Sequence, residues 1–383
     1  NEVLVDKHDI RFGSDNEYLK MDNESRELLC VGNASKSNLK VQITTKDNCD
    51  KYSIRTEPQI VTLKRGFACE FEIFLTPYCT MNLVDEIVII SLNIKDGKKE
   101  ATSITINAKT ENSTHLDYDE LIEENVLGEG SFGVVYKGSY RKYEVAIKKM
   151  KQKLQEDANQ LNEFKKEIAM LDKFRSDYLV HFFGAVFIEK KECVVTEFAQ
   201  FGSLQGLLKH KKSDEVDIKM RIKMLLDAAK GISYLHENGI LHRDIKPDNI
   251  LVFSLDVNEK VNAKLTDFGS ARNVNMLMTN MTFTKGIGTP KYMAPEKAAD
   301  IYSFAITMFE VFSWEEAFKK DDERFKYAWN IADFTSGGKR LEISKVIPYK
   351  LSVIITKSWT QETTQRMSIE NVQSALQSYI NII

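Results

Sequence analysis

The chain has 383 residues, enough for two or three domains that each bury a core of their own. Hydrophobic residues make up 43% of it and charged residues 28%, which is ordinary for a globular protein. The net charge is −3, and Lys+Arg against Asp+Glu number 15 to 18 in residues 1–114 and 38 to 38 in the rest. Neither part has the basic excess typical of a nucleic-acid-binding protein, so we expect no nucleic-acid partner. No run of about 18 apolar residues occurs, so we expect no membrane-spanning segment.

Residues 1–112 are rich in short strand-like runs. Residues 70–75 and 103–108 largely alternate polar and apolar side chains, and turn residues such as Asp96-Gly97 separate the runs. About seven or eight short strands at this spacing predict an antiparallel β-sandwich. No signal peptide precedes them, and the first residue is Asn1 rather than Met, so we expect a segment of a longer protein.

The stretch from Pro58 to Pro77 resembles the immunoglobulin-like sandwiches of the major-sperm-protein and PapD type. The resemblance rests on the pattern of strands, and residues 1–112 contain no catalytic constellation. Two roles therefore stay open for this module: docking a partner, or holding the next domain at a distance. Polar residues 113–120 predict a linker, and a second domain is expected over residues 121–383.

A glycine-rich turn, Gly128-Glu-Gly130-Ser-Phe-Gly133, opens this second domain. Glycines let a backbone approach phosphate oxygens closely, and the amides of such a turn can donate to them. Dinucleotide-binding folds have the same spacing, but there a helix follows directly and an acidic residue lies about 20 positions on. Here strand-like residues 134–136 follow, and a second run ends at Lys148. This order indicates a different nucleotide site, with Lys148 near the phosphates.

Residues 156–174 have apolar side chains at helical spacing, which predicts an amphipathic helix. Glu163 and Glu167 lie one turn apart on an adjacent face. The pattern Phe-x-x-Glu-Ile-x-x-Leu favours Glu167 as the ion-pair partner of Lys148, and Glu163 is the alternative.

Two motifs later in the chain have the chemistry of phosphate transfer, His-Arg-Asp244-Ile-Lys246-Pro-Asp-Asn249 and Asp267-Phe-Gly. A hydroxyl that attacks a phosphate needs a carboxylate to take its proton, ligands for Mg²⁺ and a cation to balance charge. Asp244 suits the base and Lys246 the cation. Asn249 and Asp267 supply oxygen ligands for the metal.

Two short apolar runs, residues 250–252 and 263–266, separate these motifs. They predict a hairpin that brings the two motifs together. Ser203 and Ser368 each precede a helical pattern, and both are predicted helix N-caps.

With both motifs in this order, residues 121–383 resemble the eukaryotic protein kinases. The resemblance implies a multi-domain chain in which the sandwich precedes a two-lobed α+β domain, with a small lobe at 121–196, a hinge at 197–202 and a large lobe at 203–383. It implies ATP and Mg²⁺ as cofactors and protein Ser/Thr hydroxyls as acceptors, since Lys246 and Thr289 look Ser/Thr-specific. The residues implied in ATP binding are Gly128, Gly130, Gly133, Val135, Ala146, Lys148, Glu167, Thr196, Glu197, Ala199 and Asp267.

The segment after Asp267 resembles an activation segment. It contains Thr279, Thr282 and Thr284, and a phosphothreonine there would carry about −1.5 to −2 charge and could pair with Arg243. Such a pair would order the segment.

One departure from the family pattern follows. Asp300 comes four residues after Glu296, where the family has about a dozen, and three residues cannot span the missing distance at about 3.3–3.6 Å each. Either residues are absent from this sequence, or the substrate-binding surface is rearranged. The alternative function is therefore a pseudokinase scaffold that binds ATP and partners without transferring phosphate.

Phe-Gly-Ser-Leu near the hinge, and Trp359 with Arg366, look like the tyrosine-kinase-like branch. With the preceding β module, the chain is similar to the cytoplasmic part of protist receptor-type transmembrane kinases. We therefore expect it on the cytoplasmic side of a membrane receptor. The five cysteines are odd in number and lack a CxxC spacing, which argues against zinc, and a reducing cytosol disfavours a disulfide.

Overall fold

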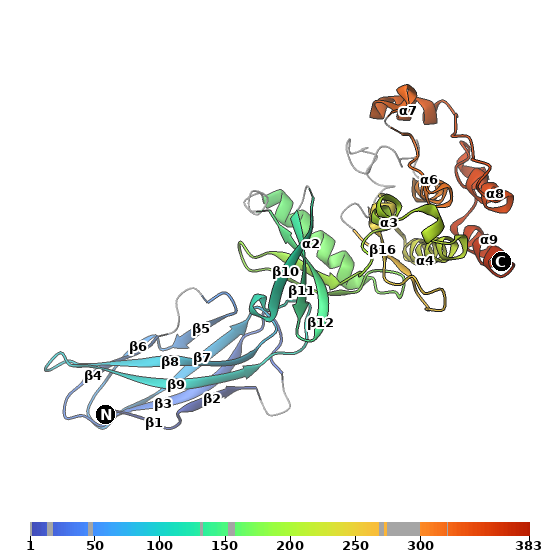
Figure 1. The fold of residues 1–383 in the computed structure, drawn as a ribbon. Coiled ribbons are helices and arrows are strands. Elements are labelled where there is room, and N and C mark those ends of the chain that lie inside the picture. The colour runs from blue at the N-terminus through green and yellow to red at the C-terminus, as the bar shows by residue number, and fades with distance from the viewer. Residues whose placement is uncertain are drawn as a thin grey trace. The chain divides into compact units, whose positions relative to one another are not determined.

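The computed structural model describes residues 2–13, 18–44, 49–130, 133–151, 158–267, 272–273, 299–319 and 321–383. The chain forms two compact units. The first contains residues 1–143, 147–155 and 183–195, and the second contains residues 144–146, 156–182 and 196–383. Figure 1 shows their strands and helices.

The N-terminal part of the first unit is a two-sheet sandwich. One sheet has the strand order β1-β3-β7-β5 and the other β2-β9-β8-β4-β6. The strands are β1 (Val3–Val5), β2 (Asp9–Phe12), β3 (Ser25–Asn33), β4 (Leu39–Thr44), β5 (Tyr52–Glu57), β6 (Ile60–Leu63), β7 (Ala68–Pro77), β8 (Asn82–Asn93) and β9 (Lys99–Lys109).

The predicted sandwich is present, but it is not antiparallel throughout. Strand β2 pairs with β9 in parallel, with Asp9 opposite Thr105 and Phe12 opposite Ala108. Strand β1 belongs to the four-stranded sheet and β2 to the five-stranded sheet of the sandwich, so the chain changes sheets between them. Strand β2 then lies at the edge of its sheet, beside β9. The expectation of an antiparallel sandwich is therefore wrong at this edge. The described part of residues 1–112 forms nine strands, where seven or eight were expected.

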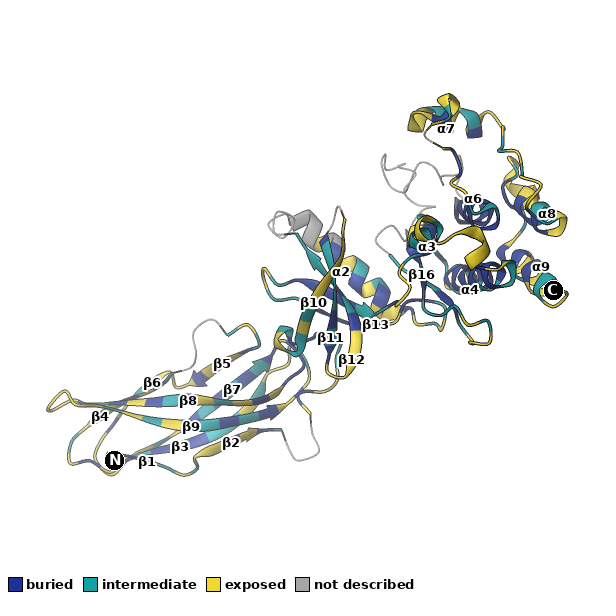
Figure 2. Ribbon diagram, in the orientation of Figure 1, coloured by how far each residue is buried: buried dark blue, intermediate teal, exposed yellow. Residues whose placement is uncertain are grey.

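Alternation of side chains builds the sandwich core. In β7, Phe71, Ile73 and Leu75 are fully buried and the residues between them face outward, as strand geometry requires. Figure 2 shows the same alternation along the other long strands. The core residues include Ile10, Leu29, Val31, Val41, Phe71, Ile73, Ile87, Ile89, Ile104 and Ile106.

A separate five-stranded sheet, called the second sheet below, has the order β10-β11-β12-β14-β13. In β12, Val145 and Ile147 are buried, so Ala146 and Lys148 lie on the opposite face of the strand. The predicted order of strand, glycine turn, strand and lysine is confirmed. The strands are β10 (Leu121–Glu129), β11 (Gly133–Tyr140), β12 (Tyr143–Met150), β13 (Phe182–Val186) and β14 (Cys193–Glu197), and the short helix η1 (Tyr118–Glu120) precedes them.

The second unit is mainly helical. Helix α4 packs against α6, α9 and strand β17, and α6 packs against α8. Helix α6 is apolar around its circumference, with Tyr302, Phe304 and Phe312 almost fully buried, which is typical of a central core helix. The helices are α2 (Ala158–Lys173), α3 (Leu204–His210), α4 (Ile218–Glu237), α6 (Ala299–Ser313), α7 (Ala328–Ser336), α8 (Tyr349–Ser358) and α9 (Ile369–Ile380).

Short elements complete this unit. The predicted hairpin is confirmed, because β16 and β17 pair antiparallel with Ile250 opposite Leu265. Both predicted N-caps are also confirmed: Ser203 accepts from Gly206 N–H, and Ser368 accepts from Asn371 N–H. The short elements are η2 (Ser213–Glu215), β15 (Ile240–Leu241), η3 (Pro247–Asn249), β16 (Ile250–Val252), β17 (Ala263–Leu265), β18 (Arg272–Asn273), η5 (Glu323–Phe325) and η6 (Thr363–Gln365).

Among the described residues, none of the helices is both long enough and apolar enough to cross a bilayer. The five cysteines are all free thiols.

Candidate active site

The loop between β15 and β16 holds Asp244 in a fixed network. Lys246 Nζ lies 2.7 Å from Asp244 Oδ2, and Asn249 Nδ2 donates to the same oxygen at 3.0 Å. Asn249 Nδ2 also donates to the backbone carbonyl of Asp244 at 2.8 Å. The short helix η3 makes this possible, because it turns the chain so that Asn249 faces back toward Asp244. The structure thus brings together three of the predicted site residues.

The side-chain oxygen atoms of Asn249 and Asp267 are suitable ligands for a divalent cation. Because the Asn249 amide nitrogen is engaged by Asp244, its amide oxygen is the group left to act as a ligand. Asp267 has a φ of 64°, a left-handed conformation that a non-glycine residue adopts only when its surroundings require it. Carboxylate and amide oxygens are the ligands that Mg²⁺ prefers. Asn249 and Asp267 therefore fit the magnesium role predicted for them.

Thr266 links Asp267 to the catalytic loop through its backbone. Its N–H donates to the Asn249 carbonyl at 3.0 Å, and its carbonyl lies 3.0 Å from His242 Nε2. His242 is fully buried, and its Nδ1 accepts from Asp244 N–H at 3.4 Å, so Nε2 is the nitrogen that donates to Thr266. The imidazole thus packs between the two motifs and has a structural role.

Asp300 anchors the start of the same loop. Its buried carboxylate accepts from the N–H of His242 at 2.8 Å and from the N–H of Arg243 at 2.7 Å. It also lies 2.9 Å from Nε2 of His236, a residue of the last turn of α4. Burial on its own would raise the pKa of Asp300, but its contacts with His236, His242 and the Arg243 amide outweigh burial and hold that pKa below its usual value.

The glycine-rich turn leaves room above two of its three glycines. Among the described residues, a Cβ at Gly128 would meet no atom within 4 Å, and one at Gly130 would lie 4.0 Å from the Gly133 carbonyl. A Cβ at Gly133 would overlap the Lys149 carbonyl, because β11 and β12 approach closely there. Gly130 N–H donates to the Gly133 carbonyl at 2.9 Å and closes the turn. The open space at Gly128 and Gly130 fits the phosphate contact predicted for them.

The residues predicted for the hinge lie at the end of β14. Thr196 and Glu197 are half-buried and Ala199 is buried. The Glu197 carboxylate accepts from Lys264 Nζ at 2.6 Å and from the His181 N–H at 2.6 Å. Glu197 is thereby tied to β17, the strand that leads to Asp267.

Other predictions stay untested. Lys148 belongs to the first unit and Glu167 to the second, so their ion pair remains a prediction. Val135 lies on β11 opposite Gly128, which is consistent with a place beside the glycine turn. Several predicted features lie outside the described residues: Phe268, Gly269, the side chain of Glu163, the threonines Thr279, Thr282, Thr284 and Thr289, and Glu296.

Sequence reasoning missed two residues of this site. Lys264 reads as an ordinary polar position of a short strand, and only the structure shows its ion pair with Glu197, in which both side chains are about one-fifth exposed. Asp300 drew attention only for its short distance from Glu296, but its bonds to two amides of the catalytic loop span 57 and 58 positions of sequence. A local sequence pattern does not predict contacts between residues so far apart in the sequence.

Comparisons with known proteins agree with this geometry. The family model of protein tyrosine and serine/threonine kinases matches residues 121–376. The chain is 29% identical to the probable serine/threonine-protein kinase gdt2 of Dictyostelium discoideum, over 85% of this chain and 20% of that protein. It is 27% identical to the probable serine/threonine-protein kinase gdt4 of the same organism, over 99% of this chain and 23% of that protein. A putative serine/threonine-protein kinase/receptor of Acanthamoeba polyphaga mimivirus is 35% identical, over 68% of this chain and 16% of that protein. The chain thus spans about a fifth of the length of these relatives.

Proposed function

The chain belongs to the protein tyrosine and serine/threonine kinase family, and we propose that it is an active kinase that transfers the γ-phosphate of ATP to Ser and Thr hydroxyls of proteins. The observation that carries this proposal is the fixed Asp244 carboxylate, held by Lys246 and Asn249. A protein that only bound nucleotide would need no such carboxylate. The names of the relatives, which are serine/threonine kinases, support the choice of acceptor.

In this proposal Asp244 orients the acceptor hydroxyl and takes its proton as the hydroxyl oxygen bonds to phosphorus and ADP leaves. Lys246 offsets negative charge on the transferring group. Asn249 and Asp267 hold Mg²⁺, which when bound supplies charge neutralisation at the phosphates. Lys148, oriented by Glu167, positions the α- and β-phosphates, and positioning with electrostatics supplies most of the rate.

The adenine would lie against the strand ends near the hinge. We place Val135 and Ala146 at its faces, Thr196 at the back of the pocket, and backbone groups of Glu197 and Ala199 at its edge. Gly128, Gly130 and Gly133 would cover the phosphates, which the open space above the first two permits. The ion pair between Glu197 and Lys264 supports this placement, because it fixes the strand end from which the adenine contacts would come.

The domain boundaries belong to the same proposal, with a sandwich at 1–112, a linker at 113–120 and a kinase domain at 121–383. Two packed sheets of nine short strands support an immunoglobulin-like type for the first module. We propose further that the chain is the cytoplasmic catalytic part of a receptor-type protein. A relative named as a kinase/receptor supports this, and fractionation of membranes with the full-length protein tests it.

Acceptor specificity is tested by incubating the chain with Mg-ATP and casein and analysing the phosphorylated residues. The proposal predicts phosphoserine and phosphothreonine, in casein or in the chain itself, and no phosphotyrosine. Nucleotide binding without any transfer would favour the pseudokinase scaffold, and would point to the short distance between Glu296 and Asp300 as the cause.

A further inference from the structure

The segment that joins the sandwich to the second sheet is hydrogen-bonded on both sides. On the sandwich side, Thr80 N–H donates to the His115 carbonyl at 2.8 Å. On the other side, Leu116 N–H donates to the Ala185 carbonyl at 2.8 Å, and Ala185 N–H donates to the Thr114 carbonyl at 2.7 Å. A backbone ladder therefore runs from the turn between β7 and β8, through residues 114–116, to β13.

This ladder covers β13, the edge strand of the second sheet, which would otherwise be exposed. Strand β13 is the last strand of its sheet, and an uncovered edge presents unpaired amides and carbonyls. His115 pairs with Ala185 as a parallel bridge at this edge. Gly184 permits the close approach, because a Cβ there would overlap the Thr114 carbonyl and lie 2.7 Å from Leu116 Cδ2. The glycine is thus fitted to this segment of backbone.

Apolar side chains are buried in the same junction. Leu116 is only 2% exposed and Cys79, on the sandwich, only 3%. The rings of His115 and Phe187 lie 4.5 Å apart between centroids. Residues of a freely moving tether would stay in contact with water, so this burial indicates a packed junction.

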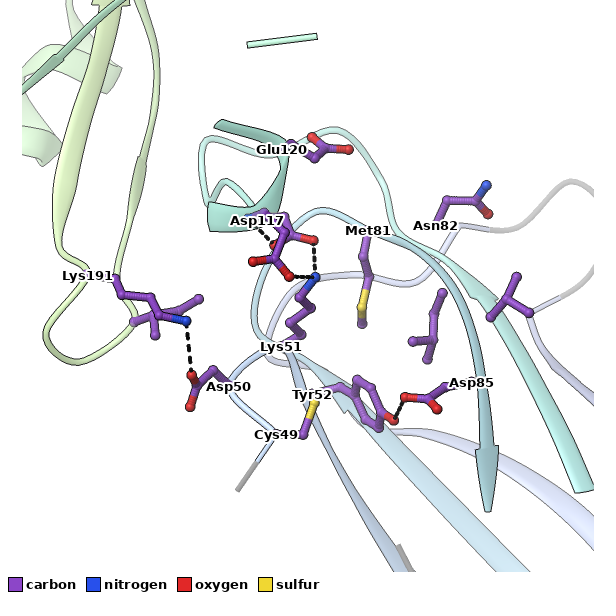
Figure 3. Close-up of a pocket in the computed structure, with 14 residues that line it drawn as sticks. Cys49, Asp50, Lys51, Tyr52, Met81, Asn82, Asp85, Asp117, Glu120 and Lys191 are labelled. Carbon is purple, nitrogen blue, oxygen red and sulfur yellow. Dashed lines mark hydrogen bonds and ion pairs between the residues drawn. The ribbon is translucent and has the colours of Figure 1, made fainter. Parts of the chain in front are cut away.

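Ion pairs add a second connection, which Figure 3 shows. Lys51 of the sandwich lies 2.7 Å from Asp117 and 2.6 Å from Asp119, and Asp50 lies 3.7 Å from Lys191 in the turn between β13 and β14. These residues line a cavity of about 550 Å³. Five of its charged groups are paired in these three contacts, while Asp85 accepts from the Tyr52 hydroxyl and Glu120 pairs with Arg141. The cavity therefore belongs to the junction between the sandwich and the second sheet.

We propose that the sandwich is a built-in regulatory element of the kinase, which caps β13 through residues 114–117 and so stabilises the strand pair that ends at the hinge. Strand β13 pairs with β14, and β14 ends at Glu197, where the adenine contacts are proposed. The nucleotide part of this inference rests on the proposed function. The stabilisation of β13 does not depend on it. Neither docking a remote partner nor simple spacing requires this ladder.

The test uses the full chain with two substitutions, Gly184→Ala and Lys51→Met. Lys98→Met is the matched control, since Lys98 pairs with Glu100 at the exposed far end of the sandwich. Hydrogen exchange is followed by mass spectrometry in residues 114–117 and 183–187, and the Kd for Mg-ATP is measured by calorimetry.

Gly184→Ala should exchange about tenfold faster in these two segments, the factor expected for the loss of one or two backbone hydrogen bonds. Lys51→Met removes the ion pairs with Asp117 and Asp119 and should exchange about threefold faster there. Exchange in the sandwich core at residues 71–75 should stay unchanged, and the control should match the parent. The Kd for Mg-ATP should rise about threefold or more in both test variants, and Lys51→Arg should restore it.

Unchanged exchange at 183–187 in both test variants would overturn the junction and leave the sandwich a tethered spacer. Faster exchange with an unchanged Kd would overturn the regulatory role. If the parent bound Mg-ATP but transferred no phosphate, the proposed catalytic function would be wrong. Hydrogen exchange and the Kd for Mg-ATP would still test the junction, because neither measurement requires phosphate transfer.

Discussion

The N–H of Arg243 donates to the buried carboxylate of Asp300 at 2.7 Å, and Arg243 has a φ of 69°. A left-handed conformation costs a non-glycine residue about 1–2 kcal/mol, so something must hold it. Asp300 does this by accepting from two consecutive amides at once, those of His242 and Arg243. The base of the proposed reaction, Asp244, is the next residue, so its placement depends on a carboxylate from helix α6.

Asp300→Asn should destabilise the second unit by about 2–4 kcal/mol. The asparagine NH₂ group would replace one carboxylate oxygen, so a buried donor would face one of the backbone N–H groups that this oxygen now accepts from. Thermal unfolding of the full chain measures this. The control is Asp333→Asn, an exposed position on α7 where the same change should alter the free energy of unfolding by less than about 0.5 kcal/mol. Equal effects at both positions would contradict the anchoring role.

The contribution of Asp300 should also depend on pH. Its folded-state pKa is depressed, so the ionised carboxylate stabilises the fold at pH values above its ordinary value of 3.8. That contribution is lost as pH falls through the lower folded-state pKa. The difference in unfolding free energy between the parent and Asp300→Asn should therefore be present at neutral pH and shrink below about pH 4. A difference that grows with acidification would contradict the assignment.

Arg221 should be a strong determinant of stability without any catalytic role. It is 5% exposed, its guanidinium donates to the Val216 carbonyl at 2.8 Å, and it also reaches the carbonyls of Val311 and Phe312 at the end of α6. Burial lowers the pKa of Arg221. Arg221→Met should cost about 2–4 kcal/mol in chemical denaturation, because it leaves buried carbonyls without donors.

The matched control for that prediction is Arg324→Met. Arg324 pairs with Asp322 at the surface, where an ion pair contributes about 0–1 kcal/mol. If the two variants unfolded at the same denaturant concentration, the buried role of Arg221 would be refuted.

Two cysteines should resist alkylation. Burial raises the pKa of the Cys193 thiol to about 12, and burial with the nearby Asp117 charge raises the pKa of the Cys79 thiol to about 12. Only a thiolate reacts readily, so iodoacetamide at neutral pH should modify neither residue in the folded chain. Mass spectrometry should find label on half-buried Cys30 and Cys49 first, and label on all five thiols after unfolding. Early modification of Cys193 would show that the second sheet opens.

Asn249→Ala should lower kcat and raise the Mg²⁺ concentration required for half-maximal rate. The change removes the donor that holds Asp244 and also the proposed amide-oxygen ligand, and we expect a loss of about 10²-fold or more in kcat. Asn258→Ala, at an exposed position of the β16–β17 turn, is the control. If Asn249→Ala had the same Mg²⁺ dependence as the parent, Asn249 would not be a ligand of the metal.

The parts of the fold that sequence predicts are those encoded by local patterns. The hairpin, the glycine turn and the serine caps depend on residues within a few positions of one another, and the structure has all of them. The helix predicted at 156–174 is present as Ala158–Lys173, so it begins two residues later and ends one residue earlier than predicted.

Contacts between distant segments could not be predicted. Nothing near Lys264 signals that it pairs with Glu197, 67 positions away. The parallel edge of the sandwich likewise depends on β2 reaching β9, about 96 positions on, and a period-2 pattern does not distinguish parallel from antiparallel neighbours. The burial of Leu116 could not be predicted either, because residues 113–120 are mostly polar and Leu116 is buried only by packing against β13.

Asp244 is proposed as the base of a phosphate-transfer reaction. Its most direct test compares kcat and the Kd for Mg-ATP in Asp244→Asn with those of Asp248→Asn, the same change at an exposed position of the same loop. We predict a kcat about 10²–10⁴-fold below the parent for Asp244→Asn, an unchanged Kd, and parent-like values for Asp248→Asn. A kcat for Asp244→Asn within about threefold of the parent would show that Asp244 is not the base, because so small a loss is well below what a general base contributes.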